Sequence, residues 1–238
     1  MEKLKELEEK WCKFRLSEKE ATDIMFNEEE DEALRYKEDR SLVGRVFSSR
    51  VISMEVLGST MGKVWRISKA AKFLELCTNI FVITFETQAD KERVWAGRPW
   101  LFDHQLLAMK SFNGFTPPQR MSFEKESFWV RMYNLPLMCM TKARGEQIGG
   151  MVGYAEEVDT QVDGSGWGKV LKEQIKMNIK LPIPRSITIK VKGESLWIPF
   201  SDEKLPRLCF SCGCIVHGES GCLKQEGDDD GGNNIGYG

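Results

Sequence analysis

The sequence predicts an α+β protein in which strands outnumber helices, and three observations support this class. Segment 41–112 shows the periodicities of strand, helix, strand, strand, helix and strand, in that order. After the proline pair Pro117 and Pro118, segment 128–200 shows a second set dominated by short strands. Residues 208–224 then concentrate four cysteines and one histidine. We therefore expect two small α+β domains followed by a cysteine-rich module.

The composition fits a folded chain. Of its 238 residues, 41% are hydrophobic and 29% are charged, which is typical of one or two globular domains. No apolar run reaches the roughly 18 residues of a membrane span, and the charged N-terminus lacks the apolar core of a signal peptide. We expect an intracellular protein, in the nucleus or the cytoplasm, with no membrane partner and with reduced cysteines.

The charges are segregated along the chain. Residues 1–34 hold 12 acidic and 6 basic residues, and residues 219–238 hold 5 and 1. Residues 35–218, between these ends, hold 27 basic and 19 acidic residues. A basic body between acidic ends fits a polyanionic partner, although a solvated surface of mixed charge explains the same numbers.

Residues 1–34 are predicted to form an acidic N-terminal helix and linker. Four large apolar residues recur at spacings of three and four, as in an amphipathic helix: Leu4, Leu7, Trp11 and Phe14. We expect this helix to dock on the body of the protein. The acidic run 28–32 then indicates a linker.

Residues 35–115 are predicted to form the first domain. The patterns indicate strands at 41–48, 72–78, 80–87 and 104–112, and helices at 51–65 and 88–97. The order β-α-β-β-α-β is that of ferredoxin-like domains, which include the RNA recognition motif (RRM). In the third strand Phe81 and Phe85 share one face. We expect this face to pack on the helices, which leaves no aromatic ring on the open face.

Residues 122–203 are predicted to form a second, β-rich α+β domain. Its expected elements are strands at 128–136, 154–162 and 170–181, a helix at 141–153, and a hairpin that turns at Gly193. Residues 225–238 are too polar and rich in glycine to fold, so we expect a disordered tail.

The module at 204–224 carries the most specific motif. Its ligand candidates follow the spacing C-x2-C-x4-H-x4-C of a CCHC zinc knuckle: Cys209, Cys212, His217 and Cys222. Three thiolates and one imidazole complete a closed tetrahedral shell, which is typical of structural zinc and leaves no position for an activated water. We therefore predict one structural Zn2+. Cys214 offers a fourth thiol that could transiently replace His217 or Cys222, but the spacing favours the four named ligands.

Several blocks of the chain resemble a plant family in which an uncharacterised RRM-like domain precedes such a knuckle. They lie at 98–112, 128–140, 148–153 and 196–213. That family is related to the first open reading frame of plant LINE-type retroelements. The resemblance covers about residues 30–222. It implies a retrotransposon-derived protein that binds RNA or another single-stranded nucleic acid and has no enzymatic role.

The resemblance also supplies candidate contacts to nucleic acid. Phe210 follows the first ligand, where related knuckles carry an aromatic ring that stacks on an unpaired base. Gly218 replaces the second large residue of retroviral knuckles, so Ile215 or Val216 would have to complete the base platform. Three basic residues are candidate phosphate contacts: Lys204, Arg207 and Lys224.

Two classes of function therefore stay open. The first is a protein that binds nucleic acid, preferably single-stranded RNA or DNA. The second is a protein-interaction module, with protein partners or self-association, whose zinc is purely structural. We expect no enzyme, no catalytic residue and no small-molecule substrate, because the motifs G-x-x-x-x-G-K-[ST], H-E-x-x-H and G-x-S-x-G do not occur.

Overall fold

The computed structural model describes residues 32–217, 221 and 222. The predicted N-terminal amphipathic helix and its docking, the C-terminal tail and Lys224 therefore lie outside the described residues. The chain divides into two units, Met1–Tyr36 and Lys37–Gly238, and the second contains all ten described strands. Within the described ranges, no helix is long and apolar enough to cross a membrane.

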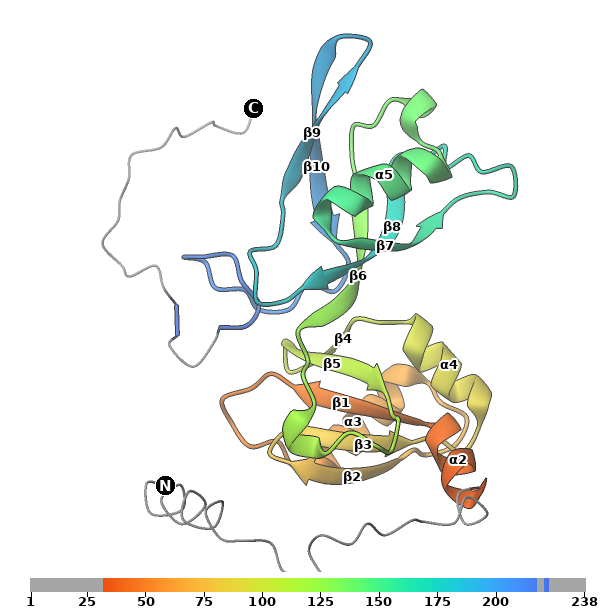
Figure 1. The fold of residues 1–238 in the computed structure, drawn as a ribbon, viewed down its shortest axis with the longest axis vertical. Coiled ribbons are helices and arrows are strands. Elements are labelled where there is room, and N and C mark those ends of the chain that lie inside the picture. Colours follow the sequence, from red (N-terminus) through yellow and green to blue (C-terminus); the bar gives the residue numbers. More distant parts are fainter. Residues whose placement is uncertain (1–31, 218–220, 223–238) are drawn as a thin grey trace, which may run out of the picture. The chain divides into compact units, whose positions relative to one another are not determined.

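The first sheet is antiparallel and has the strand order β2-β3-β1-β5-β4. Its strands are β1 (Ser41–Val46), β2 (Lys72–Cys77), β3 (Ile80–Thr84), β4 (Trp100–Phe102) and β5 (Gln105–Ser111). Helices α3 (Met54–Trp65) and α4 (Gln88–Ala96) pack on one face, and the short α2 (Glu32–Asp39) precedes β1. The predicted strands and helices all occur, whereas β4 was not predicted because three residues are too few to show a periodicity (Figure 1).

Side-chain caps set the points at which the longer helices begin. The hydroxyls of Ser53, Thr87 and Thr141 each accept a hydrogen bond from the backbone N–H three residues later. Each hydroxyl satisfies one of the free backbone amides in the first turn of its own helix, which is α3, α4 or α5 (Lys142–Val152), respectively.

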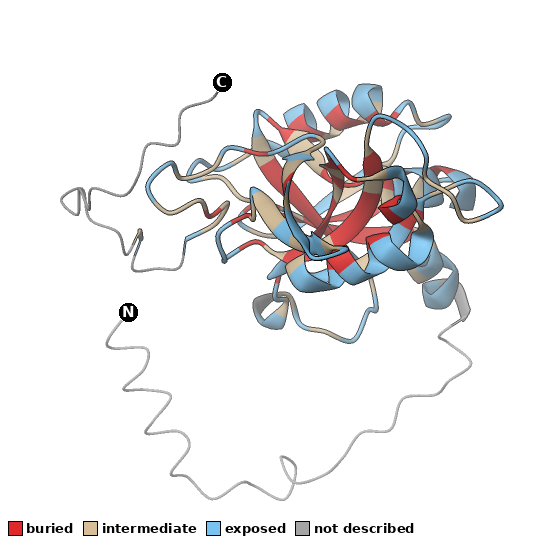
Figure 2. Cartoon of the chain, turned by 90° about the horizontal axis from the view of Figure 1, so that it is seen from above, coloured by how far each residue is buried: buried red, intermediate tan, exposed pale blue. Residues whose placement is uncertain are grey.

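The helix-facing side of the first sheet holds the predicted aromatic core. Phe81 and Phe85 are buried and belong to one apolar cluster with Leu57 and Trp65 of α3. This confirms the expectation that these rings pack on the helices. Figure 2 shows the same distribution, with burial concentrated on the strands and exposure on the outer surfaces of the helices.

The central part of the opposite face of the first sheet is also buried. Ile80, Val82 and Leu106 belong to an apolar cluster with Phe123, which lies in the connection between the two sheets. Two aromatic rings, those of Phe47 and Phe112, are half-buried against the same cluster.

The second sheet is also antiparallel and has the order β7-β8-β6-β10-β9. Its strands are β6 (Lys125–Met132), β7 (Tyr154–Asp159), β8 (Leu171–Asn178), β9 (Ser186–Val191) and β10 (Glu194–Asp202). Helix α5 packs against this sheet (Figure 1), and the short 3-10 helices η2 (Pro118–Arg120) and η3 (Leu137–Cys139) lie in the connections.

Glycines allow α5 to lie close to the second sheet. A Cβ atom on Gly145 would lie 2.8 Å from Cγ1 of Val158, and one on Gly149 would overlap the carboxylate of Glu173. Glu173 is fully buried, and neither of its carboxylate oxygens has a hydrogen-bond partner among the described residues. The close approach of α5 therefore buries a carboxyl group without a hydrogen-bond partner among the described residues, and this burial raises the pKa of Glu173 to about 8.

A buried ion pair joins the two sheets. Oε1 of Glu126, at the start of β6, lies 3.3 Å from Nη1 of Arg98, which precedes β4. Its Oε2 accepts a hydrogen bond of 2.6 Å from the backbone N–H of Met109 in β5. Burial raises the pKa of Glu126, and the positive charge of Arg98 opposes this rise. The pair fixes β6 against the first sheet.

Candidate zinc site and nucleic-acid interface

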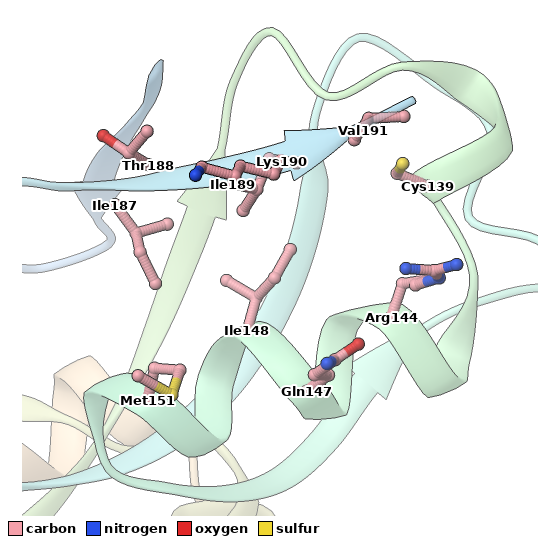
Figure 3. A pocket seen from close by; sticks show the side chains of 10 residues that line it. All are labelled: Cys139, Arg144, Gln147, Ile148, Met151, Ile187, Thr188, Ile189, Lys190 and Val191. Carbon is pink, nitrogen blue, oxygen red and sulfur yellow. The ribbon is translucent and has the colours of Figure 1, made fainter. Parts of the chain in front are cut away.

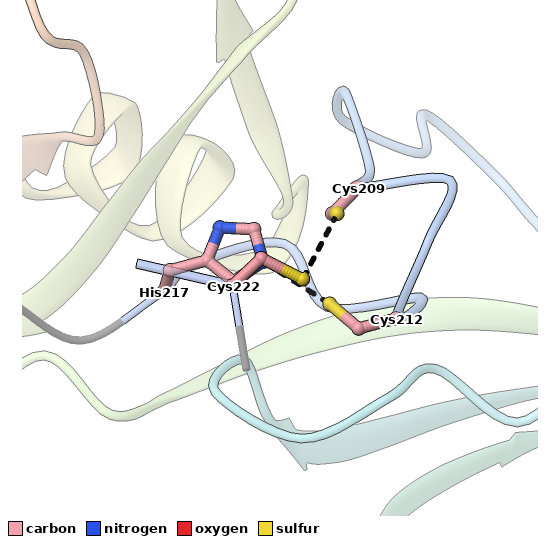
Figure 4. Close-up of side chains that lie close together, drawn as sticks. All are labelled: Cys209, Cys212, His217 and Cys222. Atoms are coloured by element: carbon pink, nitrogen blue, oxygen red, sulfur yellow. Dashed lines mark hydrogen bonds between the residues drawn. The ribbon is translucent and has the colours of Figure 1, made fainter. Parts of the chain in front are cut away.

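The four predicted zinc ligands converge on one point (Figure 4). Their ligand atoms all lie within 4.8 Å of one another: those of Cys209, Cys212, His217 and Cys222. Sγ of Cys209 lies 3.8 Å from Sγ of Cys222, and Sγ of Cys212 lies 3.1 Å from Nε2 of His217. Zn–S bonds of about 2.3 Å in a tetrahedron place two sulfurs about 3.8 Å apart. The cluster therefore fits one structural zinc ion.

Backbone hydrogen bonds shape the loop that carries the first two ligands. The N–H of Gly213 donates to the carbonyl of Cys209 at 2.7 Å, and the N–H of Cys209 donates to the carbonyl of Cys214 at 2.9 Å. Gly213 has a φ of 75°, a conformation that glycine adopts without the steric cost of a side chain. The residue after the second ligand thus lets the loop close around the metal position.

The same loop prepares its thiols for metal binding. The backbone N–H of Cys214 lowers the pKa of Cys212 to about 6, and the N–H of Cys212 lowers the pKa of Cys209. The sulfur of Cys212 in turn raises the pKa of His217. Because the thiolate is the form that binds metal, the loop favours the ligand form of both cysteines.

Cys214 lies outside the ligand cluster, as the spacing predicts. Its side chain is buried, and burial raises its pKa to about 11. A buried neutral thiol is a packing residue, so this cysteine supports the loop and does not compete for the metal.

The knuckle packs on the second sheet through backbone bonds and apolar side chains. Ile183 donates its N–H to the carbonyl of Gly213 at 3.0 Å, and Val216 donates to the carbonyl of Ile179 at 3.1 Å. Ile215 and Val216 are half-buried against the larger apolar cluster. Each side chain therefore keeps part of its surface exposed, and the expectation that one of them completes a base platform stays a prediction.

Phe210 has the opposite environment. Its ring is fully exposed although it directly follows the ligand Cys209. The metal loop fixes the backbone on both sides of this ring, so the ring is held in solvent by a rigid support.

The candidate phosphate contacts differ in their surroundings. Nζ of Lys204 donates to the carbonyl of Gly97 at 2.7 Å and lies 4.1 Å from the ring centroid of Trp100. Burial lowers the pKa of Lys204. Its ammonium therefore already has partners at the end of α4 and on β4. Arg207 is exposed. Its backbone N–H donates a hydrogen bond to the carbonyl of His104 at 3.0 Å.

A groove between α5 and β9 was not predicted (Figure 3). It has a volume of about 230 Å3, and Ile148 and Ile187 point into it from opposite sides. The other lining residues are Cys139, Arg144, Gln147, Met151, Thr188, Ile189, Lys190 and Val191. This lining contains no carboxylate and no histidine, so it offers no acid–base pair. No local sequence signal marks the groove, because it forms only when the β9–β10 hairpin stands beside α5.

Two family models match parts of the chain. A zinc knuckle model matches residues 180–224, and a model described as a domain of unknown function (DUF4283) matches residues 36–119. No curated protein matches the chain. The chain thus contains a zinc knuckle, which indicates zinc binding and, in general, nucleic-acid binding. The DUF4283 match is consistent with the plant retrotransposon-related family that the sequence resembles. The description of this model names no activity.

Metal analysis tests the ligand set. The wild-type protein should bind one zinc ion per chain, and Cys212→Ser should lose it, because a serine hydroxyl does not replace a thiolate in a closed shell. Cys214→Ser is the matched control and should keep the metal, since its thiol lies outside the cluster. Full zinc content in Cys212→Ser, or loss of zinc in Cys214→Ser, would contradict the assignment.

Proposed function

We propose that this protein binds single-stranded RNA or DNA through its zinc knuckle, with the ring of Phe210 stacked on an unpaired base. The observation that carries the proposal is the full exposure of this ring beside a zinc ligand. A single strand offers free base faces, whereas a duplex does not, and stacking contributes about 1–3 kcal/mol per base. Binding of this kind needs no catalytic residue, so the proposed role is not enzymatic.

We also propose that the first sheet is an RRM-like scaffold that does not stack bases. Its strand order β2-β3-β1-β5 supports the RRM-like class. An RRM stacks bases on aromatic rings of its open face, but the centre of that face is buried here in one cluster with Phe123, and the rings of Phe47 and Phe112 are half-buried against it. The resemblance to the plant LINE-related family supports a retrotransposon origin, in which such a protein would package or chaperone an RNA.

Substitution of the exposed ring tests the proposed function. Phe210→Ala should weaken the binding of a short single-stranded oligonucleotide by about one to two decades, which corresponds to the loss of one stacked base. Zinc content and the salt dependence of binding should not change, since the ring contacts neither metal nor phosphate. Fluorescence anisotropy with labelled single-stranded RNA, single-stranded DNA and duplex measures these affinities.

Phe115→Ala is the matched control for this substitution. Its ring is also largely exposed, at 89%, but it lies in the connection after β5 and far along the chain from the knuckle. The control should bind like the wild type. Equal affinities of wild type and Phe210→Ala would remove stacking from the mechanism.

Such a result would favour the alternative, a protein-interaction module whose zinc is purely structural. The apolar groove between α5 and β9 is the observation that favours this alternative (Figure 3). Met151 lines the groove and is exposed. Under the alternative, Met151→Asp would abolish partner binding and leave nucleic-acid binding unchanged.

A further inference from the structure

Two open hollows adjoin each other on the second sheet, and one of them extends to the first sheet. One has a volume of about 630 Å3 and the other of about 600 Å3, and Lys125 and Lys176 line both. Because these two lysines line both hollows, the hollows are neighbours, and we call the pair the lysine trough. We define it by the lining residues that the argument uses: Lys110, Lys125, Lys176, Trp95, Tyr154 and Pro182.

One end of the lysine trough reaches the zinc knuckle. Pro182 and Ile183 line the trough, and both adjoin the loop that holds the first two ligands. The N–H of Ile183 donates to the carbonyl of Gly213 at 3.0 Å, and a Cβ atom on Gly213 would lie 3.6 Å from Cβ of Pro182. A chain-like ligand held by the knuckle could therefore continue into the trough.

The lysine trough has an excess of positive charge. Lys110 and Lys125 are exposed, and neither forms an ion pair with a described residue. Nζ of Lys176 lies 3.7 Å from Oε1 of Glu156. Glu124 is the one carboxylate among the lining residues, and Nζ of Lys180 lies 2.9 Å from it. Nζ of Lys110 also lies 5.6 Å from the ring centroid of Phe123, and its charge helps to lower the pKa of Glu124. Lys125 is thus the lysine whose charge is most open to an external anion.

Aromatic rings accompany these lysines. Tyr154 is 68% exposed and lines the part of the trough nearer the knuckle. Trp95 lines the other part, and the guanidinium of Arg98 lies 3.5 Å from its ring centroid. Lysines next to rings suit a polymer that alternates phosphates with bases. An acidic peptide would use the lysines but would gain little from the rings.

We propose that the lysine trough holds the sugar–phosphate backbone of the single strand whose base stacks on Phe210. This inference rests on the proposed function and assigns a path to the rest of the strand. The trough contacts are sequence-independent and depend on salt, because lysine neutralises phosphate and releases counterions. Affinity therefore increases with strand length until the trough is filled.

Charge reversal combined with two strand lengths tests this path. Lys125→Glu should weaken binding of a 12-nucleotide single-stranded RNA about tenfold and lower its salt slope by about one unit. Binding of a 4-nucleotide RNA, which spans the knuckle alone, should stay unchanged. Lys63→Glu is the matched control, since Lys63 is exposed on α3, outside the trough, and its substitution changes the net charge equally.

Lys110→Glu provides a second, independent variant, because Lys110 belongs to the first sheet, whereas Lys125 begins the second. It should reproduce the length-dependent loss. Both lysines are exposed, but Nζ of Lys110 lies 5.6 Å from the ring centroid of the buried Phe123. Thermal unfolding followed by circular dichroism should therefore show the wild-type midpoint for Lys125→Glu and a slightly lower one for Lys110→Glu.

Each other outcome has a distinct meaning. If both trough variants bind the 12-nucleotide RNA as Lys63→Glu does, while 4-nucleotide binding still depends on Phe210, the trough is refuted and the proposed function stands. If the wild type binds neither RNA, the proposed function fails and the trough inference fails with it. If Lys125→Glu weakens binding of a polyglutamate peptide but not of the 12-nucleotide RNA, the trough serves an acidic protein and the inference is overturned.

Discussion

Glu126→Ala should lower the free energy of unfolding by about 3–5 kcal/mol, because it leaves the buried charge of Arg98 without a carboxylate partner. Both side chains are almost completely buried, and their charged groups lie 3.3 Å apart. The substitution also removes the acceptor of the N–H of Met109, and an unsatisfied buried donor adds to the loss. Urea denaturation of the zinc-loaded protein, followed by circular dichroism, measures the effect.

Two controls separate the buried pair from general effects of charge. Glu124→Ala removes an exposed carboxylate two residues earlier, whose salt bridge to Lys180 lies at the surface, and should cost less than about 1 kcal/mol. Replacing both Arg98 and Glu126 by Met should recover much of the stability, because no charge is then left unpaired. If Glu126→Ala is no less stable than Glu124→Ala, the buried pair does not join the two sheets.

Glu173→Gln should stabilise the protein at pH 8 and leave its stability at pH 4.5 nearly unchanged. Burial, and secondly the charge of Glu146, raise the pKa of Glu173 from 4.5 to about 8. Between these values the unfolded chain has released a proton that the folded protein keeps. The stability contributed by the neutral carboxyl is therefore fully present below about pH 4.5 and is lost as the pH rises to about 8.

The expected difference at pH 8 is on the order of 2–5 kcal/mol, since one pKa unit corresponds to about 1.4 kcal/mol. Glutamine has nearly the same shape and stays neutral, so it keeps the packing beneath Gly149 and removes the cost of the buried charge. Urea denaturation of both proteins at several pH values measures the difference. Parallel pH profiles would show that the pKa of Glu173 is the same in the folded and the unfolded protein. Glu146→Gln, an exposed neighbour on α5, should have a smaller effect.

The local structure of this protein follows from its sequence. Alternation and helical spacing locate the main strands and helices, and the motif from Cys209 to Cys222 identifies the metal ligands. These features can be predicted because each depends on residues close together in the chain: a strand face on every second residue, a helix on its first turn, and a zinc site on 14 consecutive residues. Strand β4 cannot be predicted in this way because its three residues are too few to show an alternation.

What the side chains contact was decided by the tertiary structure alone. Glu124 and Glu126 lie two positions apart, so strand alternation would treat them alike, yet one is exposed and the other forms a buried ion pair with Arg98. Lys204, which is predicted to contact phosphate, donates a hydrogen bond to the carbonyl of Gly97, 107 residues away. The lysine trough likewise combines side chains from β5, β6 and β8. Burial and partnership depend on how distant elements pack, and a local pattern in the sequence does not record that packing.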